Sequence, residues 1–178
     1  MMLEGLSLAR MLRMAGFVGL GFVAVSIEIA PVGLTASALP SPDLLFCLTA
    51  YCALRRPEAV PLLLVFAIGL MRDLLTDGPP GIGALILTLS ALFLTESRTW
   101  FLNRPLLIEW LAISLIFALG LALHWVLVVA SFAPAPLIAG LAWLVLATAA
   151  AYLPVALLLR LVLRIDYAPE FRRLGGAS

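Results

Sequence analysis

Ionisable side chains are scarce in this sequence, yet an adjacent pair, Arg72 and Asp73, lies near the end of an apolar segment. Charged groups at membrane depth are costly, so they usually face protein or water and mark functional positions. The surrounding stretch, residues 69–83, reads GLMRDLLTDGPPGIG and turns on its glycines and prolines. We call this stretch the elbow, and we expect the rest of the chain to hold it in place.

Asp73 has two interpretations. It lies one helical turn after Gly69 and one turn before Asp77, so the three share a face if the helix continues that far. In the first interpretation it makes a polar contact at the outer mouth of a helical bundle, and Gly69 lets a neighbouring helix approach. In the second, Arg72 and Asp73 form an ion pair at the membrane interface and Asp77 is solvated in the turn. Spacing alone favours the second, because charges near the ends of spans are cheaper than charges at the bilayer centre.

The elbow glycines are explained most simply by the turn itself. Gly78, Gly81 and Gly83 flank or follow two prolines, and glycine tolerates backbone angles that other residues avoid. A phosphate-binding loop would need a following Lys and Ser or Thr, which Gly81-Ile82-Gly83 lacks. The turn therefore indicates structure, and no cofactor is expected.

The remaining reactive side chains lack suitable partners in the sequence. His124 is the single histidine and has no clustered carboxylates nearby, so we expect a structural or interfacial role rather than a metal. Cys47 and Cys52 have no metal-ligand spacing and are interpreted as small buried hydrophobes. Glu28 and Glu109 lie near opposite membrane faces, where headgroups or loop donors are the expected partners. No acid–base pair or nucleophile motif is present, so the sequence does not indicate an enzyme.

Composition determines the broad class. The chain has 178 residues, of which 64% are apolar and 12% charged, and its mean hydropathy is +1.17. Soluble domains have about 45–50% apolar and about 25% charged residues. The apolar residues form continuous runs rather than alternating with polar ones, so the spans are helical and not strands of a barrel. The net charge of +1 gives no basis for binding nucleic acid. The prediction is an all-α integral membrane protein.

Six spans are expected in one transmembrane domain, residues 14–163, between a lead-in, residues 1–13, and a polar tail, residues 164–178. The spans cover residues 14–34, 39–54, 60–75, 81–95, 106–132 and 137–163. The second is the weakest, at about sixteen residues against the ~20 that a bilayer core requires. The first resembles a signal peptide with a cleavage site at residues 36–38. Glu28 and Pro31 make the region before that site unusual for such a signal, so we expect the span to be retained.

Arginine placement predicts the orientation, because Lys and Arg concentrate in short cytoplasmic loops. One side of the six-span arrangement carries arginines 10, 13, 55, 56, 98, 104, 160, 164, 172 and 173, and the opposite loops carry none. Arg72 is the exception, just inside the outer end of the third span. Both termini are therefore predicted to be cytoplasmic.

Small residues recur at helical spacing in several spans. They include glycines 16, 19 and 21 in the first span, Ser114, Ala118 and Ala122 in the fifth, and Ala147 and Ala151 in the sixth. Small side chains let helices approach closely in lipid. These faces either hold the bundle together or dock another membrane helix. The internal role is favoured because every helix of a bundle needs neighbours.

Four segments occur in an order and spacing that resemble a known family. They are PDLL from Pro42, YCALRRP from Tyr51, GLMRDLL from Gly69 and GPPG from Gly78. This order resembles the core of MreD, a family of bacterial rod-shape-determining proteins. Pro80 stands where that family commonly has leucine, which leaves the turn intact.

The resemblance implies a non-enzymatic inner-membrane protein of the machinery that builds the lateral cell wall. The implied partners are the single-span protein MreC, the actin-like MreB, the glycosyltransferase RodA, its partner transpeptidase and membrane lipid. The family is regarded as sharing a compact six-helix fold with the substrate-binding subunits of energy-coupling-factor transporters. Carried over by position, Gly69, Asp73 and Gly81 are expected to matter most. Further structural or docking candidates are Pro42, Arg72, Asp77, Gly78 and Gly83.

Two other function classes stay open from the sequence. A transporter subunit that binds a small molecule should line its cavity with hydrogen-bonding groups, and the spans offer few of these. A membrane chaperone or assembly factor would have no stable partner in the wall machinery.

Overall fold

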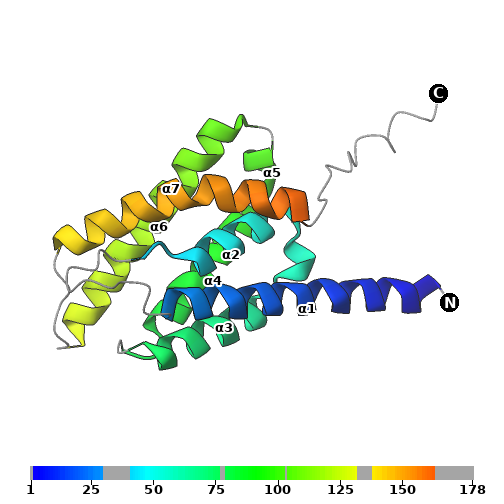
Figure 1. Cartoon of the computed structure of the whole chain (residues 1–178), viewed down its shortest axis with the longest axis horizontal. Helices are drawn as coiled ribbons and strands as arrows, with labels where there is room; N and C mark the ends of the chain where they lie inside the picture. The colour runs from blue at the N-terminus through cyan, green and yellow to red at the C-terminus, as the bar shows by residue number, and fades with distance from the viewer. Residues whose placement is uncertain (1, 30–40, 77–78, 103, 132–137, 163–178) are drawn as a thin grey trace.

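The computed structural model describes residues 2–29, 41–76, 79–102, 104–131 and 138–162, and all secondary structure in these ranges is helical (Figure 1). The elements are α1 (Met2–Ile29), α2 (Leu44–Arg55), the 3-10 helix η1 (Pro57–Ala59), α3 (Leu62–Leu75), α4 (Ile82–Glu96), α5 (Arg98–Leu102), α6 (Leu106–Ala130) and α7 (Ile138–Val162).

Among the described residues, three helices are long and apolar enough to cross a membrane, over Arg10–Ile29 in α1, Leu106–Ala130 in α6 and Ile138–Leu161 in α7. The chain is therefore described as a membrane protein. The helices α2, α3 and α4 have 12, 14 and 15 residues. At 1.5 Å per residue they are about 18–22 Å long, whereas the hydrocarbon core is about 30 Å thick. The predicted spans 60–75 and 81–95 thus correspond to helices, and the count of six crossings stays a prediction.

The core is built around α2. This short helix packs against α1, α4 and α7, and its ten residues from Leu45 to Leu54 are all buried. A helix that is apolar on every side belongs in the interior of a protein or membrane. Aromatic packing ties it to α6, where the rings of Phe46 and Phe117 lie 4.7 Å apart between centroids.

The outer helices present apolar side chains to their surroundings. Exposed leucines cover α6 and α7, including Leu115, Leu119, Leu157 and Leu158. Lipid tails are as apolar as leucine, so such faces are stable in a bilayer.

The glycines differ in how closely a neighbouring helix approaches them. A Cβ built on Gly69 would lie 2.9 Å from the Cα atom of Ala84, so α3 and α4 approach closely at this point, as expected. Gly21 also faces neighbours, Ile68 among them. Gly16 and Gly19 have no atom within 4 Å of a built Cβ, so no helix in the described part of the chain approaches them, and docking of another helix there stays a prediction.

Candidate functional site

Asp73 caps the first turn of α4. Its Oδ2 atom accepts hydrogen bonds from the backbone N–H groups of Gly81, at 3.0 Å, and Ala84, at 2.9 Å. The first N–H groups of a helix have no partner within the helix, and a carboxylate there also meets the positive end of the helix dipole. Asp73 therefore closes the elbow by joining the end of α3 to the start of α4.

The elbow glycines surround this carboxylate. Gly81 has φ +93°, a left-handed conformation that L side chains rarely adopt. Gly83 lies inside α4, and a Cβ there would collide with Asp73 Oδ1. The sequence explained Gly83 mostly by the turn, whereas this glycine lies within α4 and makes room for the cap. Asp77 and Gly78 lie outside the described residues.

Arg72 points to a different set of partners. Its Nε atom lies 3.0 Å from Oε2 of Glu28, and its Nη1 atom lies 2.8 Å from Oδ2 of Asp43. The exposed fractions of the three side chains are 27%, 8% and 11%. The ion pair predicted between Arg72 and Asp73 is therefore wrong: the planar guanidinium uses two separate donors to bridge α1 and the start of α2.

The same carboxylates cap α2. Glu28 Oε1 accepts from the N–H of Leu45 at 3.0 Å, and Asp43 Oδ1 accepts from the N–H of Phe46 at 2.7 Å. The N–H of Asp43 donates to Oγ1 of Thr148 on α7 at 3.0 Å. We call Glu28, Asp43, Arg72 and Thr148 the outer cluster. It brings α1, α3 and α7 to the first turn of α2, so the expectation that Glu28 meets headgroups or a loop is wrong.

Pro42 directly precedes this capping residue and is half-buried. Because Asp43 is the N-cap of α2, the proline stands just outside the helix, where a missing N–H costs nothing. Its position agrees with a structural role at the start of α2.

A second cluster lies at the other end of α2. Arg55 Nη2 donates to both carboxylate oxygens of Glu109, at 3.0 and 2.8 Å, and the Tyr152 hydroxyl donates to Glu109 Oε1 at 3.0 Å. The Arg55 guanidinium also lies over the ring of Tyr51, 5.5 Å from its centroid. We call Arg55, Glu109 and Tyr152 the inner cluster. Glu109 is only 3% exposed, so its predicted contact with headgroups or loop donors is wrong.

The two clusters are suited to holding helices rather than to chemistry. Each carboxylate oxygen of Glu28, Asp43 and Glu109 already accepts a hydrogen bond or an ion pair. In the part of the chain that the structure describes, no group of His, Cys, Asp and Glu side chains is placed to hold a metal ion. Cys47 and Cys52 are buried and free, as small hydrophobes would be.

Comparison with known proteins identifies the family. The model for rod shape-determining protein MreD matches residues 7–162 of the 178-residue chain, which includes the elbow and both clusters. Comparisons with curated proteins and with solved structures found no match. Because the matched region covers most of the sequence, the chain belongs to the MreD family of rod shape-determining proteins.

Proposed function

We propose that this protein is a non-enzymatic inner-membrane component of the bacterial cell-wall elongation complex. It helps maintain rod shape by binding MreC and by supporting lateral peptidoglycan synthesis with MreB, RodA and the elongation transpeptidase. The single observation that carries this proposal is the family match over residues 7–162. The buried carboxylates and arginines bond to other groups of the protein itself, which supports a structural role.

The proposed topology has six crossings and cytoplasmic termini, in a compact bundle like the substrate-binding subunits of energy-coupling-factor transporters. The placement of arginines supports the orientation. Short helices are compatible with this topology where neighbouring protein covers their ends, because non-helical backbone at membrane depth is tolerated when it is buried in protein.

We place the docking surface for MreC at the elbow. The hydrogen bonds of Asp73 join the end of α3 to the start of α4, so the residues next to Asp73 lie on a helix end that is held in place. Leu74 and Leu75 are 69% and 55% exposed, and Thr76 and Pro80 are exposed as well. An apolar surface at the end of α3 suits a partner that buries these leucine side chains, since interface cores are more apolar than their rims.

A small-molecule-binding subunit of a transporter is the alternative function. Such a subunit needs polar groups that are free to meet a ligand. The carboxylates of Glu28, Asp43 and Glu109 instead bond to the protein itself. This arrangement favours the scaffold.

The test is a pull-down of the tagged protein from native membranes in mild detergent, with partners identified by mass spectrometry. Recovery of MreC with the wall synthases supports the proposal, whereas recovery of a transmembrane coupling subunit with ATPases supports the transporter alternative. Recovery of neither set favours an assembly factor.

The docking surface is tested separately with Leu74→Arg, which leaves both clusters and the cap unchanged. Its matched control is Leu63→Arg, because Leu63 is 82% exposed at the opposite end of α3. We expect Leu74→Arg to lose MreC and rod shape while the control keeps both. Equal recovery of MreC with the two variants would contradict docking at the elbow and leave the family role untouched.

A further inference from the structure

A short segment next to the inner cluster is not used by the proposed function. Helix α5 connects α4 to α6 and packs against α2 and α4 (Figure 1). Just after it, the Arg104 guanidinium lies over the Trp100 ring, 5.2 Å from the ring centroid. We call Arg104 and Trp100 the headgroup pair, and we propose that they bind the phosphate of an anionic phospholipid.

A buried neighbour fixes the headgroup pair on the bundle. Phe101 is only 3% exposed and belongs to the core, and its ring meets the Trp100 ring edge-on, with 5.0 Å between the centroids. Trp100 is 48% exposed, and Arg104 is exposed as well. The core therefore determines where the tryptophan ring lies, and the ring in turn supports an accessible guanidinium.

The start of α6 places the pair at the depth of the lipid phosphates. The apolar span Leu106–Ala130 begins two residues after Arg104 and is about 38 Å long, at 1.5 Å per residue. The hydrocarbon core of a bilayer is about 30 Å thick, so each end of α6 extends about 4 Å into the headgroup layer. Tryptophan is enriched at this level in membrane proteins. Because both leaflets contain phosphates there, the proposal does not depend on the predicted orientation.

The charge of Arg104 has no acidic partner in the described part of the chain. The arginines of both clusters bind carboxylates of the protein, whereas the side chain of Arg104 contacts the Trp100 ring. Glu96 is the one acid in residues 96–104, which also contain Arg98, and it forms no ion pair with Arg104. A stacked guanidinium keeps the N–H groups of its edge for two parallel hydrogen bonds to phosphate oxygens. The pair therefore suits a phosphate that carries net negative charge.

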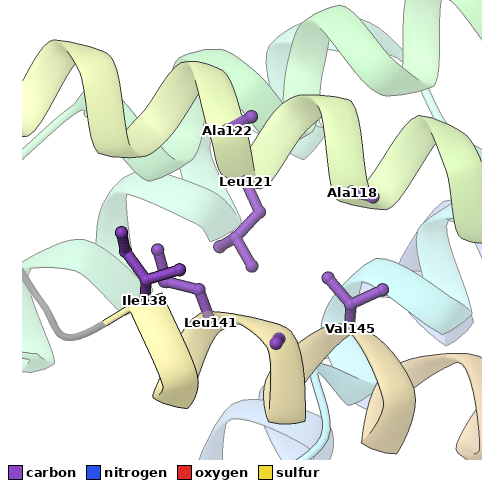
Figure 2. Close-up of a pocket in the computed structure, with 7 residues that line it drawn as sticks. Ala118, Leu121, Ala122, Ile138, Leu141 and Val145 are labelled. Atoms are coloured by element: carbon purple, nitrogen blue, oxygen red, sulfur yellow. The ribbon is translucent and has the colours of Figure 1, made fainter.

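The groove between α6 and α7 does not offer this chemistry. It has a volume of about 240 Å³, and the side chains that line it, Ala118 and Val145 among them, are all aliphatic (Figure 2). Contact with lipid tails in the groove would be the same for every headgroup. A preference for one headgroup therefore separates binding at the headgroup pair from contact in the groove.

Native mass spectrometry of the full chain tests the proposal by comparing phosphatidylglycerol with phosphatidylcholine of the same acyl chains. In the second lipid the choline cation offsets the phosphate charge. We expect phosphatidylglycerol to bind at least about fivefold more tightly, because one basic side chain near an anionic lipid contributes about this factor. Arg104→Gln should abolish the preference. Arg160→Gln is the matched control, since Arg160 is exposed in the last turn of α7, and its preference should stay within about twofold of wild type.

Two further variants test the stacked geometry. Arg104→Lys keeps the charge and loses the planar fork, and Trp100→Leu keeps the arginine and loses the ring. Each should lower the preference about threefold. Both residues are exposed, so the thermal unfolding midpoint should stay at the wild-type value and shows that the fold is intact.

Four results would overturn the proposal. Equal losses in Arg104→Gln and Arg160→Gln would show general attraction to positive charge, and an unchanged preference in both Arg104→Lys and Trp100→Leu would show that the stack is not used. Displacement of the lipid by an equal concentration of glycerol phosphate would assign the pair to a soluble phosphate. A photocrosslink from Trp100→benzoylphenylalanine to a protein rather than to lipid in native membranes would assign it to a protein partner. None of these measurements involves MreC, so they leave the proposed function untouched.

Discussion

Replacing Arg72 with leucine tests whether the outer cluster stabilises the bundle. The substitution removes both ion pairs, at 3.0 and 2.8 Å, and leaves the carboxylates of Glu28 and Asp43 side by side with little solvent. Breaking a buried ion pair by removing one partner typically costs 3–5 kcal/mol, because the remaining charge has no compensation. Arg72 is partly exposed, so we take the lower end, about 3 kcal/mol.

The assay is thermal unfolding of the purified protein in detergent, followed by the loss of monodisperse protein after heating. For a chain of 150–250 residues, 1 kcal/mol corresponds to about 2–4 °C, so Arg72→Leu should lower the midpoint by roughly 6–12 °C. Arg104→Leu is the matched control, because Arg104 is exposed and stacks on the Trp100 ring without contacting either cluster.

A second substitution separates lost charge from lost packing. In the Arg72→Leu background, Glu28→Gln removes one of the two uncompensated charges and keeps an oxygen that can accept from the N–H of Leu45. We expect it to recover part of the stability, because neutral replacements for a buried ion pair are often tolerated. An Arg72→Leu variant as stable as wild type, or a double variant less stable than the single one, would refute the reasoning.

Three further substitutions test the elbow and the inner cluster by the same thermal assay. Gly69→Ala forces α3 away from α4 and should cost about 1–3 kcal/mol. Gly16→Ala meets no atom and should be neutral or slightly stabilising, because alanine favours a helix more than glycine does, and equal effects of the two substitutions would contradict the close approach. Gly83→Ala displaces the Asp73 carboxylate and should cost about as much as the lost cap, about 1–2 kcal/mol, with no further loss when Asp73→Ala is added. Tyr152→Phe removes only the hydroxyl that donates to the inner cluster and should cost about 1 kcal/mol, and an unchanged midpoint would show that this bond contributes nothing.

The place of the elbow could be predicted from the sequence, because glycines and prolines mark its turn. The cap could not, since spacing favoured an ion pair between Arg72 and Asp73, whereas Asp73 accepts from N–H groups 8 and 11 residues further along the chain. The close approach of another helix at Gly69 could also be predicted, since small residues let helices approach. The contact of Gly83 could not, because nothing in its spacing shows that a carboxylate occupies the volume of its missing Cβ.

The two clusters could not be predicted because their members are far apart in sequence. Asp43 lies 29 residues from Arg72, and Arg55 lies 54 residues from Glu109. Each of these residues stands near the end of an apolar segment, where a headgroup, a loop or another helix is an equally good partner. The sequence does show that acidic residues and arginines both occur near the ends of the spans, so ion pairs between them are possible. It does not show which acid pairs with which arginine.

The short central helix explains why these charges persist in so apolar a chain. The sides of α2 are buried from Leu45 to Leu54, so its free N–H groups meet protein rather than water. Side chains from α1 and α2 itself supply the acceptors at its first turn, and Arg55 lies in its last turn, where a positive charge complements the helix dipole. Arg72 and Glu109 then balance the charges that this arrangement introduces. Because Arg72 is followed directly by Asp73, the residue that secures the central helix adjoins the residue that closes the elbow. A partner that binds the elbow would therefore contact a surface that one short segment of α3 connects to the central helix α2.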